Sequence, residues 1–210
     1  MPFISEIEGD LDWRVEEIDQ FRHLLLRPSN STVTERVLIR AGWALLYAHY
    51  EGFCKFALTA YFDEIRRMGI ASCNLPRAMH RRSLERSLKE VKNASSKFIL
   101  ERLEKIIFDE YRSAAEFPEV DTQSNLWPQV LAEILDDADI WLPSLDNHRF
   151  KIQTLVARRN KIAHGERDLI FDLRYYLDFE SVVSELMYEL ALEAEVRLEE
   201  LAATHGCGRP

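Results

Sequence analysis

Residues 32–68 read TVTERVLIRAGWALLYAHYEGFCKFALTAYFDEIRRM and form a long, uninterrupted helical pattern. Thr32 followed three positions later by Glu35 predicts a capping box at its start, and Gly69 predicts its end. Apolar side chains occupy most of the helix circumference: Leu38, Trp43, Leu45, Leu46, Tyr50, Phe53, Phe56 and Leu58. A helix that is apolar on nearly all sides is usually buried among other helices. We therefore expect this segment to be the central helix of a bundle.

Apolar residues recur at helical spacing through most of the remaining sequence. Helices are expected at about residues 4–26, 77–92, 98–107, 128–137, 148–164 and 175–202, with a break at residues 28–31. No stretch alternates apolar and polar residues over the length of a strand. These patterns predict an all-α fold, a single helical bundle of five to seven helices. It would span residues 1–210 as one domain, with residues 204–210 as a flexible tail.

The composition narrows the class of protein further. The chain has 210 residues, 47% of them hydrophobic, which excludes intrinsic disorder. Its three cysteines form no CxxC pair, so neither a disulfide framework nor a structural zinc site is expected. The longest apolar stretch without a charge, Ala41–Tyr50, is too short to span a bilayer, and the N-terminus does not resemble a signal peptide. We expect a cytoplasmic protein without membrane contact, metal or cofactor.

The stretch His148–Gly165 reads HRFKIQTLVARRNKIAHG and carries the candidate chemistry. Its apolar residues define one stripe of a helix: Ile152, Leu155, Val156, Ile162 and Ala163. Arg159 falls on this stripe where a leucine is expected. A guanidinium is rarely buried unless it is paired or binds an anion. Asn160 and His164 are four residues apart, so they share one edge of the helix beside the stripe.

Arg159, Asn160 and His164 together meet the requirements of RNA cleavage without a metal ion. A histidine has a suitable pKa to take the proton from a ribose 2′-hydroxyl. An arginine can bind phosphate oxygens bidentately where charge accumulates, and an asparagine can orient either partner. The alternative interpretation is structural: Arg159 forms a buried salt bridge, and His164 caps the helix C-terminus, where a cation is favoured.

Several further residues are candidates for supporting roles. Glu51 lies in an apolar part of residues 32–68 and needs a partner; the candidates are Arg159, whose guanidinium it would orient, and Lys55 one turn away. Four basic residues could bind RNA phosphates or merely be solvated: Arg149, Lys151, Arg158 and Lys161. The aromatic residues between positions 43 and 50 are interpreted as core rather than as a platform for bases.

Three blocks of the sequence resemble the HEPN superfamily, in particular its RiboL-PSP-type branch. They are WALLYAHYEGFCK (Trp43–Lys55), TQSNLWPQVLAEIL (Thr122–Leu135) and RNKIAHGE (Arg159–Glu166). The last block contains the Arg, polar residue and His of the HEPN signature. The resemblance runs from about residue 35 to residue 190 and keeps the three blocks in the order of the family.

The resemblance implies a metal-independent endoribonuclease that acts as a homodimer, with Arg159, Asn160 and His164 as the catalytic set in a shared cleft. Its products would carry a 2′,3′-cyclic phosphate and a 5′-hydroxyl. The resemblance also implies a toxin–antitoxin or phage-defence setting, with a cognate antitoxin or a defence-system protein as partner. Glu166 stands where many HEPN toxins have the tyrosine that an antitoxin adenylylates, so that form of control is not expected. Two alternatives stay open: a non-catalytic HEPN module that binds nucleotide or protein, and an antitoxin-like helical interaction protein.

The charge distribution bears on RNA binding. The formal charge of −9 argues against a protein that coats nucleic acid. However, residues 66–92 carry eight basic residues against Glu85 and Glu90, and residues 148–165 carry five and no acid. A local positive cleft on an acidic protein can concentrate a polyanion at one place. The sequence therefore permits cleavage of RNA at one site, provided that these basic stretches lie near each other or near the cleft.

Overall fold

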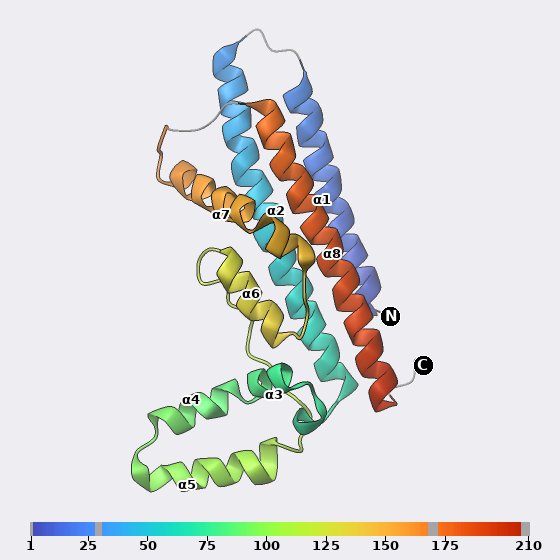
Figure 1. Ribbon diagram of the computed structural model, residues 1–210, viewed down its shortest axis with the longest axis vertical. Coiled ribbons are helices and arrows are strands. Elements are labelled where there is room, and N and C mark those ends of the chain that lie inside the picture. The colour runs from blue at the N-terminus through green and yellow to red at the C-terminus, as the bar shows by residue number, and fades with distance from the viewer. Residues whose placement is uncertain (1, 28–30, 168–171, 207–210) are drawn as a thin grey trace. The chain divides into compact units, whose positions relative to one another are not determined.

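The computed structural model describes residues 2–27, 31–167 and 172–206. Over these residues the chain forms eight α-helices, a 3₁₀ turn η1 and a π-helical turn η2 (Figure 1). Their bounds are α1 Pro2–Leu26, α2 Thr32–Met68, η1 Ser72–Asn74, α3 Arg77–Ser83, α4 Glu85–Asn93, α5 Ser96–Lys105, η2 Ile106–Glu110, α6 Pro128–Asp137, α7 Pro143–Ala163 and α8 Leu173–His205. Within the described residues the β-structure is limited to an isolated bridge between Ala71 and Ala114. The all-α prediction is confirmed.

The helices outnumber the expected five to seven because one expected helix is divided. The basic segment 77–92 forms two helices, since Leu84 has φ −99° and ψ 1° and breaks the helical backbone between α3 and α4. The helix expected at 148–164 begins earlier, with Pro143 in its first turn, where the missing N–H costs nothing. It bends at His148, which has φ −113° and ψ 15°. The sequence pattern had identified only the part beyond this bend.

The start of α2 differs by one residue from the expected capping box. The Thr34 N–H donates to the Ser31 hydroxyl at 3.3 Å, so Ser31 caps the helix instead of Thr32. The expected end at Gly69 is confirmed by its φ of +66°, a backbone conformation that glycine adopts most easily. The interior of α2 is buried as expected, with Trp43, Tyr50 and Phe53 fully inaccessible to solvent.

The chain divides into two compact units. Unit 1 comprises Met1–Ala57, Asp121–Ala132 and Leu142–Leu192, and unit 2 comprises Leu58–Val120, Glu133–Trp141 and Glu193–Pro210. Both α2 and α8 contribute residues to each unit. That residues 1–210 form a single domain stays a prediction.

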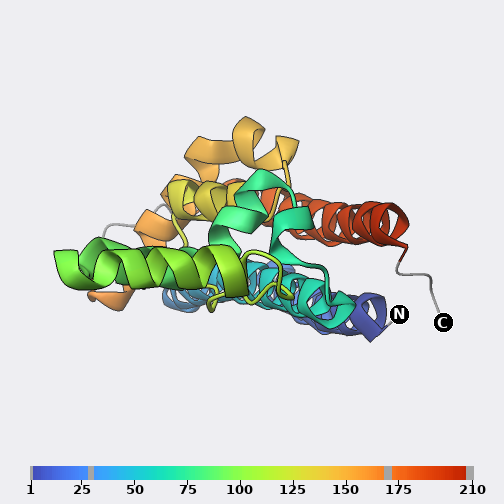
Figure 2. The same cartoon turned by 90° about the horizontal axis from the view of Figure 1, so that it is seen from below.

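Unit 1 is built from α1, the N-terminal parts of α2, α6 and α8, and the whole of α7. In both views, α1 and the N-terminal part of α2 lie side by side (Figures 1 and 2). Gly42 of α2 is so close to α1 and α8 that a Cβ there would lie 2.8 Å from Phe21 and 3.0 Å from Tyr176. The Trp43 ring packs edge-on against Tyr176 and Phe179 of α8. These contacts make α2 the central helix of this unit, as the sequence predicted.

Unit 2 is held by polar contacts around a smaller apolar core. The Tyr61 hydroxyl donates to the Ala138 carbonyl at 3.0 Å. The Arg82 side chain is only 7% exposed and stacks on the Phe62 ring while it pairs with Asp137 at 3.1 Å. A buried guanidinium needs such partners.

Two sequence expectations concern the chain's ends and breaks. Residues 204 and 205, expected in the tail, still belong to α8; residues 207–210 lie outside the described residues, as do residues 28–30 of the expected break. No helix in the described part of the chain is both long and apolar enough to cross a membrane.

Candidate functional site

Residues from all three sequence blocks that resemble HEPN proteins meet within unit 1. The Leu126 backbone is held by two tyrosines of α2: its N–H donates to the Tyr47 hydroxyl at 2.9 Å, and its carbonyl accepts from the Tyr50 hydroxyl at 3.0 Å. On the same turns of α2, Tyr47 and Glu51 contact Arg159 of α7. Residues that lie up to 112 positions apart are thereby brought to one place.

Arg159 is held on three sides. Its Cζ lies 4.1 Å from the centroid of the Tyr47 ring, its Nη1 donates to Asn160 Oδ1 at 3.1 Å, and its Nη2 lies 3.5 Å from Glu51 Oε2. The side chains of Arg159 and Glu51 remain 26% and 22% exposed. A charge-assisted hydrogen bond is usually about 2.7–2.9 Å long, so the longer Glu51 contact orients the guanidinium without occupying all its donors.

Burial along α7 explains why this arginine is tolerated. Ile152, Leu155 and Val156 are completely buried, as the stripe predicted. Beyond them the stripe rises toward the surface, because Ile162 is half-buried and Ala163 is exposed. Arg159 therefore lies at the boundary between core and solvent, where its aliphatic part can be covered and its head stays accessible.

His164 lies at the end of α7 and is exposed to solvent. The helix ends in a Schellman motif: the Glu166 N–H donates to the Lys161 carbonyl at 2.9 Å and the Gly165 N–H to the Ile162 carbonyl at 3.0 Å. Gly165 has φ +78°, which confirms the predicted helix stop. This turn fixes the backbone of His164 one helical turn beyond Asn160.

Arg40 was not identified from the sequence, although it supports this turn. Its Nη2 donates to the Ile162 carbonyl at 3.0 Å and its Nη1 donates to the Glu166 carbonyl. A cation at a helix C-terminus satisfies carbonyls that lack partners and opposes the negative end of the helix dipole. The two accepting residues lie on either side of His164, so Arg40 holds the chain on both sides of the candidate catalytic histidine.

Tyr47 was interpreted from the sequence as a core residue only. It is 2% exposed, and burial raises its pKa to about 12, with nearby Glu51 acting in the same direction. The ring is thus a neutral platform under Arg159 at physiological pH. The only sequence signal for this role is its position one turn before Glu51.

The four candidate RNA-binding residues have different surroundings. The Arg158 guanidinium lies 4.8 Å from the Trp43 ring and 5.0 Å from the Tyr175 ring, so it joins α7 to α2 and α8. Lys151 pairs with Asp178 of α8 at 2.8 Å, and Lys161 lies 4.0 Å from Glu166. Of the four, Arg149 is exposed, and the Lys161 side chain is 44% exposed.

The basic stretch at residues 66–92 is largely neutralised within unit 2. Arg66 and Arg67 pair with Asp63 and Glu64 one turn earlier. Further along, Arg81 pairs with Asp136 and Asp137, Arg82 with Asp137, Arg86 with Glu90, and Lys89 with Glu85. A charge count along the sequence cannot show this compensation, because two of the acids come from α6. Residues 148–165 belong to unit 1, so the two basic stretches lie in different units.

Comparison with protein families identifies the class of this protein. The family model described as HEPN_MAE_28990-like HEPN matches residues 3–200. The chain therefore belongs to this HEPN family, and the superfamily inferred from the three blocks is confirmed. The RiboL-PSP-type branch stays a prediction. A search of curated proteins found no match, and a search of solved structures found none either.

Proposed function

We propose that this HEPN protein is a metal-independent endoribonuclease whose active site is completed by a second copy of the chain. Arg159, Asn160 and His164 are its catalytic set, and Glu51 and Tyr47 orient the arginine. It acts in the cytoplasm in a toxin–antitoxin or phage-defence setting. Glu166 in place of a tyrosine argues against control by adenylylation at that position.

The observation that carries the proposal is the way Arg159 is presented. Three neighbours fix the guanidinium, yet a quarter of the side chain stays accessible. An exposed imidazole follows five residues later, about 7.5 Å along the helix axis. An oriented cation beside an accessible histidine suits cleavage of a phosphodiester, which needs stabilisation of the charge that develops on the phosphate oxygens and a base near the ribose.

The reaction needs two proton transfers. One imidazole takes the proton from the ribose 2′-hydroxyl, and the 2′-oxygen attacks phosphorus to form the 2′,3′-cyclic phosphate. The bond from phosphorus to the 5′-oxygen breaks, and that oxygen takes a proton from a general acid. The next histidine along α7, His148, lies about 24 Å away by helix geometry and pairs with Glu185. A second copy would supply the second imidazole as the partner's His164.

The contact between Arg159 and Glu51 favours a second candidate function. In a non-catalytic HEPN module, Glu51 would neutralise Arg159 inside one chain, and the pair would be purely structural. Such a module binds RNA or a protein partner without cutting RNA.

Incubation of the purified protein with RNA in EDTA separates the two functions. Under the proposal, His164→Ala lowers the cleavage rate at least about 100-fold, the usual contribution of a general acid or base. His148→Ala is the matched control, because it removes an imidazole from the same helix and should leave the rate unchanged. Equal background cleavage by wild type and His164→Ala would refute the ribonuclease. Expression in a bacterial host, with growth and RNA integrity scored for wild type and Arg159→Ala, tests the proposed setting.

A further inference from the structure

Residues 84–112, which include α4, α5 and η2, form a helical hairpin in unit 2 (Figure 1). No side chain of α4 or α5 is buried. Eight large apolar residues of the hairpin are between 36% and 75% exposed: Leu88, Phe98, Ile99, Leu100, Leu103, Ile107, Phe108 and Tyr111. An exposed apolar cluster of this size usually marks an interaction surface.

The length of the two helices supports the same conclusion. Helices α4 and α5 have 9 and 10 residues, and isolated helices shorter than about 12–15 residues are marginal in water. Ile99, Leu103 and Ile107 follow one another at four-residue spacing along α5 into η2, with Leu100 beside them. Such a ridge is the part of a helix that normally packs against another helix.

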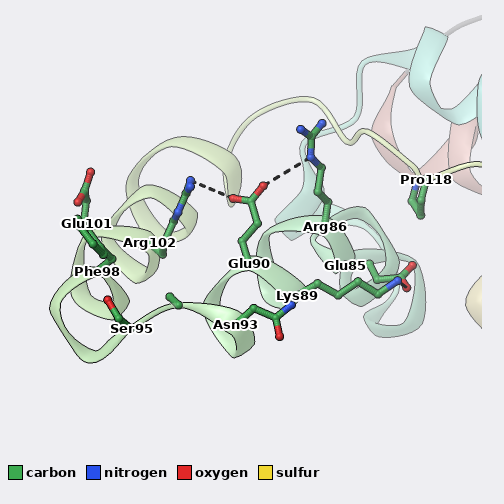
Figure 3. Close-up of a pocket in the computed structure, with 11 residues that line it drawn as sticks. Glu85, Arg86, Lys89, Glu90, Asn93, Ser95, Phe98, Glu101, Arg102 and Pro118 are labelled. Atoms are coloured by element: carbon green, nitrogen blue, oxygen red, sulfur yellow. Dashed lines mark ion pairs between the residues drawn. The ribbon is translucent and has the colours of Figure 1, made fainter.

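The charge of the hairpin limits which partner can cover it. Residues 84–112 contain seven Lys or Arg and six Asp or Glu, so their formal net charge is +1, whereas that of the whole chain is −9. About half of these charges pair within the hairpin. Glu90 lies between Arg86 at 3.6 Å and Arg102 at 2.9 Å (Figure 3), Lys105 lies 3.4 Å from Glu110, and Lys89 pairs with Glu85. This self-neutralised surface offers little attraction to a polyanion or an anionic membrane.

A second copy of the same hairpin fits these properties. Two acidic chains repel each other least where each is nearly neutral. The eight side chains present roughly 600 Å² per chain if a fully exposed large side chain offers about 150–200 Å². Two hairpins that cover each other would bury at most about 1,200 Å² of this surface, which reaches the lower bound for stable interfaces.

We propose that two copies of this protein associate through their α4–α5 hairpins, whose four short helices then form one bundle. The same surface of each chain faces its copy, as in a two-fold symmetric contact. This contact is separate from the one that would complete the ribonuclease site, and it does not depend on any activity toward RNA.

Sedimentation velocity of the full-length protein without RNA tests this proposal. Leu100→Glu places a charge at a side chain that is 66% exposed, so the fold should tolerate it. The expected result is a sedimenting mass at least halved relative to wild type at the same concentration. Leu192→Glu is the matched control, because Leu192 is 58% exposed on α8; it should keep the wild-type mass. Equal masses for wild type and Leu100→Glu, or equal losses in both variants, would overturn the proposal.

A cross-linking experiment identifies the surface directly. Leu100→Cys in a Cys73→Ser and Cys207→Ser background should give covalent dimers with a short bis-maleimide, whereas Leu192→Cys in the same background should not. Absence of the Leu100→Cys dimer contradicts the proposed contact. Two further results would also overturn it. If wild type co-sediments with anionic vesicles, and Leu100→Glu abolishes this binding without changing the sedimenting mass, the hairpin is a membrane-binding surface. If wild type binds RNA, and Leu100→Glu abolishes that binding without changing the mass, it is a nucleic-acid-binding surface.

Discussion

Tyr47 has two separable parts, a hydroxyl that hydrogen-bonds Leu126 and Glu51 and a ring beneath Arg159, and Tyr47→Phe removes only the hydroxyl. The phenol oxygen accepts the Leu126 N–H at 2.9 Å, whereas the ring lies 4.1 Å below the Arg159 guanidinium. Phenylalanine keeps the ring and its interaction with the cation. We therefore expect Tyr47→Phe to lose stability while it retains most of the activity that depends on Arg159.

Tyr47→Phe should lose stability because the Leu126 N–H, which is buried, no longer has the Tyr47 hydroxyl as its acceptor. A buried N–H that loses its acceptor costs about 1–3 kcal/mol in the free energy of unfolding. The cost should shrink at high pH. The pKa of Tyr47 is about 12 in the folded protein and about 10 in the unfolded chain. Wild type therefore loses stability as the pH rises from 10 to 12, because only the unfolded state releases the proton. At pH 11 this loss is about 1.4 kcal/mol.

Urea denaturation of both proteins at pH 8 and at pH 11 measures this difference. The gap in the free energy of unfolding should be about 1.4 kcal/mol smaller at pH 11, since the other tyrosines titrate alike in both proteins. Tyr47→Leu, which also removes the ring, should in addition lower RNA cleavage. An unchanged gap between pH 8 and pH 11, or equal activity of the Phe and Leu variants, would refute the separate roles of hydroxyl and ring.

Three other predictions concern the ends of α7 and the core of α2. Gly165→Ala should lower the free energy of unfolding by about 1–2 kcal/mol, because alanine is strained at φ +78°. Gly9→Ala is the control and should be stabilising, because Gly9 lies within α1 and no atom would obstruct the added Cβ. A stabilised Gly165→Ala would contradict the capping motif. Arg40→Met should accelerate amide hydrogen exchange at Gly165 and Glu166 and reduce RNA cleavage. Arg149→Met, which removes an exposed arginine from α7, is the control for exchange; unchanged exchange in Arg40→Met shows that Arg40 does not hold the turn. Burial lowers the pKa of His49, so wild type should lose stability as the pH falls below about 6.5, where the unfolded chain binds a proton first. His49→Gln should show a smaller loss in denaturation at pH 7 and pH 5, and an equal loss would show that His49 does not contribute.

The elements with strong local signals could be predicted from the sequence. The apolar periodicity of α2, α7 and α8 is a property of each segment alone, and so are the glycine stops at Gly69 and Gly165. The position of Arg159 on the inner stripe of α7 follows from the same periodicity. These features depend on residues within a few turns of each other, where spacing determines which side chains share a face.

The contacts between distant segments could not be predicted in this way. Nothing near Arg40 in the sequence indicates that it caps a helix more than 120 residues later, and the role of Tyr47 depends on α7 crossing α2 at that turn. The break between α3 and α4 at Leu84 could not be predicted, because no glycine or proline lies near it in the sequence. The basic stretch at residues 66–92 looked like a polyanion surface because its acidic partners, Asp136 and Asp137, come from another helix.

A mixing experiment tests most directly whether paired copies of His164 cut RNA. Wild-type protein is held at a fixed concentration in EDTA and equilibrated with increasing amounts of inactive His164→Ala, and RNA cleavage is measured. If the site needs an imidazole from each chain, RNA cleavage should fall steadily as wild-type chains enter mixed dimers with His164→Ala. Leu192→Glu is the control: it keeps His164, so adding it should not inhibit RNA cleavage. Cleavage that stays constant at a large excess of His164→Ala, or no cleavage by wild type alone, would contradict the composite ribonuclease site.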